Sequence, residues 1–234
     1  MSYQEQPPAS GFHNTVISLS DAERGAFLKR TYLHLFAAMA VFAGLEAYFL
    51  QSGVSQRLAE LLLDRWWIAI GGLVLVSWIA TRTAHRAASP ALQYAALGGF
   101  VLAEAVVFAP MLWIASTFAP GVIQSAAAAT LVGFALLTAV VFVTGRDFSF
   151  LRSALIWLGL CALGLIVCSL VFGWVLGTWF SVGMIAFAGA AILYDTSNIL
   201  HHYPADRHVG AALELFASVA MLFWYVLRLF MARD

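Results

Sequence analysis

The chain has 234 residues, of which 62% are hydrophobic and only 10% are charged, and its formal net charge is zero. Its mean hydropathy is +0.88. A soluble globular domain has about 45–50% apolar and about 25% charged residues, so this composition excludes a soluble enzyme domain. The sequence also has no basic tract, which argues against nucleic acid as a partner. We therefore expect an integral membrane protein whose main partner is the lipid bilayer.

Residues 1–27 are predicted to form a cytoplasmic N-terminal segment, followed by one membrane domain over residues 28–234. The segment contains Glu5, Pro7 and Pro8, and it lacks a basic start that leads directly into an apolar stretch. It therefore does not resemble a cleavable signal peptide. The first apolar run is expected to remain as a membrane anchor.

Seven apolar runs are separated by charged or turn-rich breaks. A helix needs about 20 residues to cross a hydrocarbon core of about 30 Å, and it satisfies its own backbone polar groups. The runs are Thr31–Leu50, Trp66–Ala80, Ala91–Ala115, Val122–Val143, Phe150–Trp174, Leu176–Leu200 and Gly210–Phe230. We predict an all-α bundle of seven transmembrane helices. The break at Gly173–Gly177 is weak, so a single re-entrant element is an alternative there to the tight hairpin that we favour.

The basic residues are not shared equally between the segments on the two sides of the predicted membrane. With the N-terminus in the cytoplasm, the inner segments hold eight of the twelve: Arg24, Lys29, Arg30, Arg82, Arg86, Arg146, Arg152 and Arg207. The outer segments and the C-terminal end hold the other four, which are Arg57, Arg65, Arg228 and Arg233. Basic residues favour the cytoplasmic side. We therefore predict a cytoplasmic N-terminus and an external C-terminus, which requires an odd number of spans.

Four acidic residues lie inside these runs, and an ionisable residue within lipid is a functional-site hypothesis by default. Glu46 is close to the outer end of the first run, where we expect it to reach the membrane interface. Glu104 is near the middle of the third run, between apolar neighbours. An ionised, unpaired carboxylate would be costly there, so we expect Glu104 to be protonated, paired or facing a wet cavity. A structural hydrogen bond and a role in transport both stay open for it.

Asp195 and Glu214 are the stronger candidates for a functional site. Asp195 shares a helix face with the small residues Ala188 and Ala191, near the end of the sixth run. Glu214 lies just inside the seventh run, and a short turn at 203–207 joins the two. The two carboxyl groups should therefore lie at similar depth on antiparallel neighbours. Two adjacent carboxylates do not both ionise cheaply, so we expect a proton-controlled latch or a cation site if their faces meet.

Enzymatic and metal-binding functions are not supported by the motifs. The histidines of the last turn, His201, His202 and His208, have spacings that do not suit a metal site, and we interpret them as solvated loop residues. A retinal protein needs a lysine in a late span, but the only lysine is Lys29. Ser218 has no protease-like glycine context. We expect no catalytic activity and no resident cofactor or metal, with Ca²⁺ at most a transiently bound ion.

Several stretches resemble the Bax inhibitor-1/YccA family. They are Phe27–Tyr32, Gly145–Leu151, Ala190–Leu200, Ala211–Phe216 and Tyr225–Leu229, and Asp195-Thr-Ser-Asn-Ile199 is the most specific of the matches. The resemblance spans almost the whole chain. The ending Met231-Ala-Arg-Asp234 is more similar to the bacterial YccA-type branch.

The resemblance implies a seven-helix bundle whose last helix is central and ringed by the other six. Some members are pH-sensitive calcium leak channels, gated by an aspartate on helix six paired with one on helix seven. Asp195 matches the first aspartate. The second falls at Ser218, because the family's Leu-Tyr-Leu-Asp pattern here reads Leu215-Phe-Ala-Ser218. Glu214 is one turn before Ser218 on the same face, so helical spacing suggests that it replaces the missing carboxylate.

Two functional hypotheses follow. The YccA-type branch also resembles this chain in having serine at that position, and its members are associated with the membrane-anchored AAA protease FtsH. The favoured hypothesis is an inner-membrane regulator of membrane-protein quality control that modulates an FtsH-type protease. The alternative is a pH-sensitive leak channel for Ca²⁺, other cations or H⁺, gated near Asp195. The proton- or cation-sensing candidates are Asp195, Glu214, Ser218 and Glu104.

Overall fold

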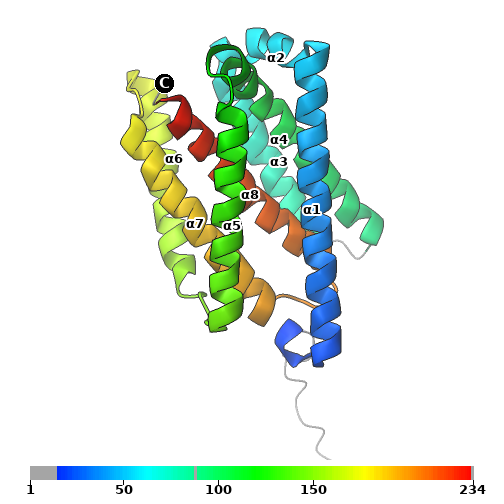
Figure 1. Ribbon diagram of the computed structural model, residues 1–234. Coiled ribbons are helices and arrows are strands. Elements are labelled where there is room, and N and C mark those ends of the chain that lie inside the picture. Colours follow the sequence, from blue (N-terminus) through cyan, green and yellow to red (C-terminus); the bar gives the residue numbers. More distant parts are fainter. Residues whose placement is uncertain (1–14, 87–88, 233–234) are drawn as a thin grey trace, which may run out of the picture.

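The computed structural model describes residues 15–86 and 89–232, without the side chains of residues 64, 66, 69, 70, 85 and 86. Within these residues the regular structure is helical (Figure 1). The α-helices are α1 (Asp21–Ser52), α2 (Val54–Leu62), α3 (Trp66–Arg86), α4 (Pro90–Phe118), α5 (Val122–Thr144), α6 (Leu151–Phe172), α7 (Thr178–His201) and α8 (His208–Met231). Short 3-10 helices, η1 (Val16–Ser18) and η2 (Leu63–Arg65), precede α1 and α3.

Six of the described helices are long and apolar enough to cross a membrane: α1, α4, α5, α6, α7 and α8. They correspond to the first and the third to seventh predicted runs, with ends that differ by up to two residues in the fifth and sixth. The second run forms α3, a helix of 21 residues that is not among these six. The short helix α2 was not predicted, and it lies across one end of the bundle (Figure 1). Gly53, with a left-handed φ of 76°, separates α2 from α1.

The first predicted span and the segment before it form one continuous helix. Ser20 and Glu23 make a reciprocal capping box that starts α1, in which each side chain accepts a hydrogen bond from the other residue's backbone N–H. With 32 residues α1 is about 48 Å long, which exceeds the hydrocarbon thickness. The predicted domain boundary at residue 28 therefore falls inside a helix. Residues 1–14 of the expected cytoplasmic segment lie outside the described residues.

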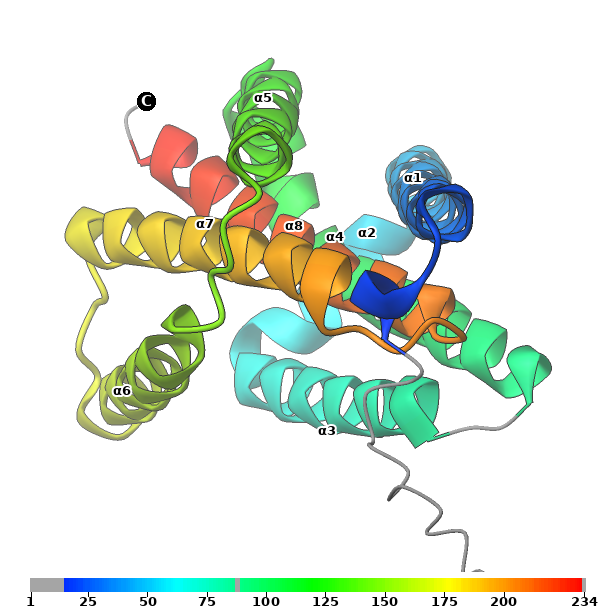
Figure 2. The same cartoon turned by 90° about the horizontal axis from the view of Figure 1, so that it is seen from below.

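The last helix occupies the centre of the bundle, as expected. Among the described helices α8 packs against α1, α3, α4, α5 and α7, and most of its residues are buried. The expectation that six helices surround α8 is wrong for one of them, α6. The helix α6 packs against α7, and none of its residues, all of which are described, is buried. Figure 2 shows α7 lying between α6 and α8, which keeps α6 on the outside.

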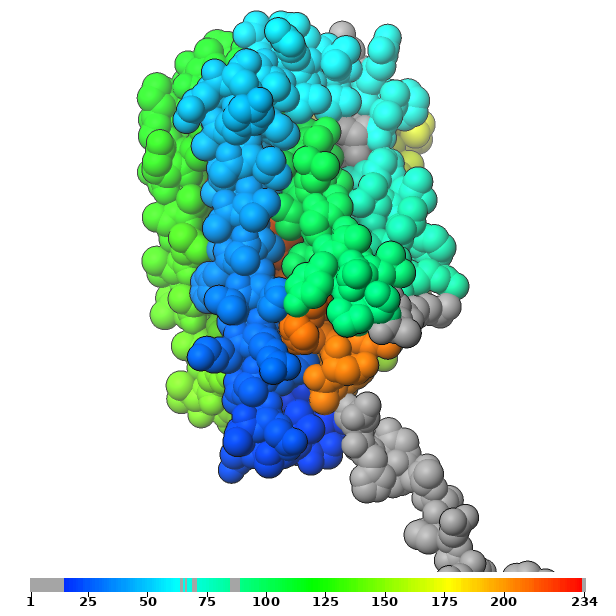
Figure 3. All heavy atoms as spheres, turned by 90° about the vertical axis from the view of Figure 1, so that its right-hand side faces the viewer, coloured from blue at the N-terminus to red at the C-terminus, as the bar shows by residue number. Residues whose placement is uncertain are grey.

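The weak break between the fifth and sixth runs is a hairpin, so the re-entrant alternative is wrong. Gly173 ends α6 with a φ of 70°, a left-handed conformation that glycine adopts without steric cost, and α7 begins at Thr178. The start of α1 and the end of α8 lie at opposite ends of the bundle (Figure 1). In Figure 3, α1 runs along the height of the molecule, with the start of α8 beside its lower part and α2 at the upper end.

The central position of α8 predicts an uneven response to truncation. Leu215 of α8 is fully buried, whereas Leu158 of α6 is 55% exposed. Leu215→Ala should lower the free energy of unfolding by about 2 kcal/mol or more, because it leaves a cavity among five helices. Leu158→Ala should cost much less. Unfolding of both variants in mixed micelles measures the difference, and equal losses would contradict the central placement of α8.

Candidate functional site

The α7–α8 contact holds a buried hydrogen bond between two of the predicted residues. The Ser218 hydroxyl donates to Oδ2 of Asp195 at 2.5 Å, and both residues are less than a tenth exposed. Ala188 and Ile192, on the same side of α7 as Asp195, are fully buried. The small side chain of Ala188, one of these two, helps α8 to approach closely enough for a serine to reach the aspartate.

Glu214 is the second carboxyl group of this contact. It lies six residues after the start of α8, and Asp195 lies six residues before the end of α7, so the two are at equal depth. Their charges are close enough to repel each other. The Glu214 carboxyl group is also close enough to the Tyr203 hydroxyl to oppose its ionisation. The structure thus joins Asp195, Ser218 and Glu214 in one polar cluster, which we call the α7–α8 cluster.

Tyr203 covers the end of this cluster from the loop between α7 and α8. Its side chain is only 2% exposed. Burial, together with the neighbouring carboxyl groups of Glu214 and Asp195, raises the pKa of the Tyr203 hydroxyl, so the hydroxyl keeps its proton. The backbone N–H of Val16 donates to the Tyr203 carbonyl at 2.9 Å, and the Phe27 ring lies 6.4 Å from the tyrosine ring. The N-terminal residues therefore hold Tyr203 in place.

A second set of polar contacts ties the loop between α5 and α6 to the end of α7. Ser197 Oγ accepts from the backbone N–H of Phe148 at 2.8 Å and lies 3.4 Å from Asp147 Oδ1. His202 Nε2 lies 2.8 Å from Asp147 Oδ2. Partial burial opposes ionisation of Asp147, but hydrogen bonds from His202 and Ser149 outweigh it and lower the pKa of Asp147 to about 2. We call these contacts the Asp147 clamp.

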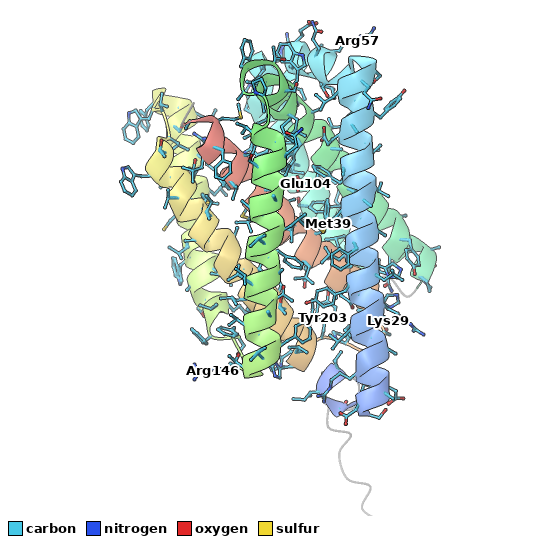
Figure 4. The ribbon with its side chains drawn as sticks, viewed as in Figure 1. Lys29, Met39, Arg57, Glu104, Arg146 and Tyr203 are labelled. Atoms are coloured by element: carbon cyan, nitrogen blue, oxygen red, sulfur yellow. The ribbon has the colours of Figure 1, made fainter. Side chains whose placement is uncertain are left out.

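The other two acidic residues of the predicted runs lie elsewhere. Glu104 is buried in α4, and Figure 4 places it well above Tyr203, so it does not join the α7–α8 cluster. Glu46 was expected to reach the membrane interface, and this prediction is wrong: its side chain is only 4% exposed. The position of Glu46 along α1 predicted its depth in the membrane but not its neighbours. Its side chain lies on the face of α1 that points toward α5 and α8.

Comparison with known proteins agrees with this architecture. The family model described as "Inhibitor of apoptosis-promoting Bax1" matches residues 24–234. The chain belongs to this family. It is similar to the "Bax inhibitor 1" of Schizosaccharomyces pombe, with 29% identity over 243 residues that cover 96% of this chain and 84% of the yeast protein. It is also similar to the "Golgi anti-apoptotic protein" of vaccinia virus (strain Lister), with 27% identity over 227 residues that cover 93% and 90% of the two chains.

The sequence resemblance implies an aspartate at position 218 in some members and a serine in the YccA-type branch. In this chain the Ser218 hydroxyl hydrogen-bonds to Asp195. Glu214, one turn earlier on α8, carries the other carboxyl group of the α7–α8 cluster. The cluster therefore contains two acidic groups, and the Ser218 hydroxyl donates to one of them, Asp195.

Sequence reasoning missed Tyr203 and the Asp147 clamp. Both depend on contacts between segments far apart in the chain, such as Phe148 with Ser197. One signal was present, because the clamp joins the two stretches, 145–151 and 190–200, on which the family resemblance rests. His202 was interpreted as a solvated loop residue; its side chain is half exposed and also contacts Asp147.

Gly210 predicts how tightly Tyr203 is held. A Cβ at this position would lie 3.0 Å from the Tyr203 hydroxyl and 3.5 Å from the Ala84 carbonyl oxygen. Gly210→Ala should therefore lower stability by about 1–3 kcal/mol through overpacking. In a Tyr203→Phe background the same change should cost less, because the hydroxyl is gone. Thermal unfolding of the two single variants and the double variant gives the coupling energy, and strictly additive effects would contradict this contact.

Proposed function

We propose that this Bax inhibitor-1 family protein is a pH-sensitive leak channel for cations, with Ca²⁺ or H⁺ as the permeating ion, gated at the α7–α8 cluster. The observation that supports it is a buried aspartate, Asp195, that a serine hydrogen-bonds while a second carboxyl group, Glu214, repels it. The geometry thus favours the alternative sequence hypothesis over regulation of a protease. Neither role requires catalysis by the chain.

The gating argument rests on charge inside the bundle. When at least one of Asp195 and Glu214 is protonated, the two helices remain in contact through the Ser218 hydrogen bond. When both are ionised, two like charges share a contact that is poor in water, and their repulsion favours separation of α7 from α8. The exposed carboxylates then attract a cation into the gap. Tyr203, held by Val16, closes the end of the bundle next to the α7–α8 cluster.

The proposal includes a topology of seven spans. At 21 residues α3 is about 31 Å long, enough to cross the hydrocarbon core beside α4. An odd number of spans agrees with the start of α1 and the end of α8 lying at opposite ends of the bundle (Figure 1). Lys29 and Arg146 lie at one end and Arg57 at the other (Figure 4). We assign the Lys29 end to the cytoplasm, and the YccA-type resemblance suggests the inner membrane of a bacterium.

A second role, as a regulator of an FtsH-type membrane protease, is favoured by α6. This helix packs against α7 and buries none of its own residues, all of which are described, so one long face of it is available to another membrane helix. Small residues on that face include Gly164, where an added Cβ would meet nothing within 4 Å. Close helix contacts in membranes use such small residues.

The leak hypothesis predicts opposite outcomes for two substitutions at the cluster. Ser218→Ala removes the hydroxyl that holds Asp195 against α8, so it should raise Ca²⁺ or proton flux several-fold. Asp195→Asn can still accept the serine hydrogen bond but carries no charge, so its flux should no longer vary with pH between pH 5 and 8. Flux into proteoliposomes loaded with a Ca²⁺ or pH indicator measures both effects.

Asp206→Asn is the matched control, because it makes the same change at an exposed carboxyl group that pairs with Arg207 on the surface. It should leave flux and its pH dependence as in the unmodified chain. Glu214→Gln should reduce the pH dependence as Asp195→Asn does. If Asp195→Asn and Glu214→Gln both behave like the control, the leak hypothesis fails.

The protease hypothesis predicts physical association. The chain should co-purify with a membrane-anchored AAA protease, and its overproduction should slow the turnover of that protease's membrane substrates. Gly164→Trp should weaken both effects by crowding the free face of α6. Unchanged turnover and the absence of co-purification would together rule this role out.

A further inference from the structure

A crevice between α1 and α5 holds the buried carboxyl group of Glu46, on a part of the bundle that the α7–α8 cluster does not use. Its volume is about 570 Å³, within the range of small-molecule sites, and α8 forms its floor. The lining side chains from the three helices include Phe36, Ala43, Leu131 and Phe216. Figures 1 and 2 both show α1 and α5 on the same side of the molecule, flanking α8. A crevice on the side of a membrane bundle opens toward lipid.

A second hollow of about 520 Å³ lies along the same two helices, shares Phe36 and Leu131 with the crevice and extends to Tyr32. The rings of Tyr32 and Phe142, 5.9 Å apart, join α1 to α5 at its far end. From Leu50 to Tyr32 the two hollows together follow α1 for about 27 Å, a length that suits an extended amphiphile rather than a compact solute.

Polar side chains line both hollows: Glu46 and Thr130 line the first, and Tyr32 and Thr138 line the second. The side chains of Glu46 and Thr130 are both at least nine-tenths buried. Neither carboxyl oxygen of Glu46, nor the Thr130 hydroxyl, has a hydrogen-bond partner among the described residues. Leaving such groups unpaired in an apolar setting costs several kcal/mol in total. A ligand that pairs with them therefore gains more than apolar burial alone supplies.

We propose that this crevice binds a single-chain amphiphile from the bilayer, with an uncharged, hydroxyl-bearing headgroup at Glu46 and Thr130 and its chain lying between α1 and α5. A hydroxyl both donates and accepts, so it satisfies Glu46 in either protonation state and also the Thr130 hydroxyl. A phosphate headgroup would meet the carboxyl group with no basic side chain among the described lining residues. An ammonium headgroup would donate to Glu46 but offer no acceptor to Thr130.

A photoreactive analogue of 1-oleoylglycerol tests the site in phosphatidylcholine nanodiscs. The labelled peptides should come from residues 36–50 of α1 and 123–131 of α5. Ala43→Phe places a ring in the crevice and should remove most of this labelling. Ala37→Phe is the matched control, because it makes the same change on the same helix at an exposed residue that does not line the crevice, and it should leave labelling unchanged.

The headgroup part of the proposal has its own test. Glu46→Leu should weaken labelling by the glycerol probe about tenfold, since the headgroup loses its hydrogen bonds. The variant should fold at least as stably as the unmodified chain, because it removes an unpaired buried carboxyl group, and thermal unfolding checks this. A probe with the same chain and a phosphate headgroup should label the crevice weakly.

Equal labelling by the two probes, or labelling that Ala43→Phe and Glu46→Leu leave unchanged, would mean lipid contact around the bundle only and would overturn the proposal. The result does not depend on the leak hypothesis. The crevice substitutions lie on α1, whereas the flux variants lie on α7 and α8, so either proposal can fail while the other stands.

Discussion

The contact between α7 and α8 has to accommodate a carboxyl group at a depth where apolar side chains and lipid offer it little water. Asp195 meets this constraint through the hydroxyl of Ser218, and the hydrogen bond needs the two helices to approach closely. The close approach in turn depends on small residues such as Ala188 on α7 and on the enclosure of α8 by five other helices. The arrangement of the bundle is therefore tied to one polar contact, because moving α8 would leave the aspartate without its donor.

The Asp147 clamp extends this constraint to the loop between α5 and α6. Ser197, which accepts the backbone N–H of Phe148, lies two residues after Asp195 on α7. A displacement of the end of α7 that broke the Asp195 contact would therefore also strain the clamp. The contact between Asp147 and His202 is exposed at both residues, so it contributes little stability by itself. The position of the loop relative to α7 is fixed by the buried part of the clamp, the hydrogen bond from the Phe148 backbone N–H to Ser197.

The sequence predicted the parts of this structure that depend on length and local pattern. The predicted runs lie within the observed helices α4 and α5 and match the ends of α6 to α8 to within about two residues, because the bilayer sets the length of an apolar helix. The short turn after α7 correctly placed Asp195 and Glu214 at equal depth.

Helix α2 was missed because nine residues are too few for a span. The burial of Glu46 was missed because depth along a helix does not determine which neighbour its face meets. The contact of Tyr203 with Glu214 was missed because it joins a loop to a helix face.

The α7–α8 cluster and the α1–α5 crevice meet on α8. Glu214 and Ser218 are one turn apart and face α7, while Phe216 and Val219 face the crevice. A shift or rotation of α8 that separates it from α7 also changes the floor of the crevice. A ligand that binds the crevice more tightly when α8 contacts α7 must therefore stabilise that contact. Because such coupling is reciprocal, ionisation of the cluster, which separates the two helices, must weaken binding of the ligand to the crevice. The coupling requires no chain of contacting residues between the two sites, because binding at either site changes the preferred position of the same rigid helix.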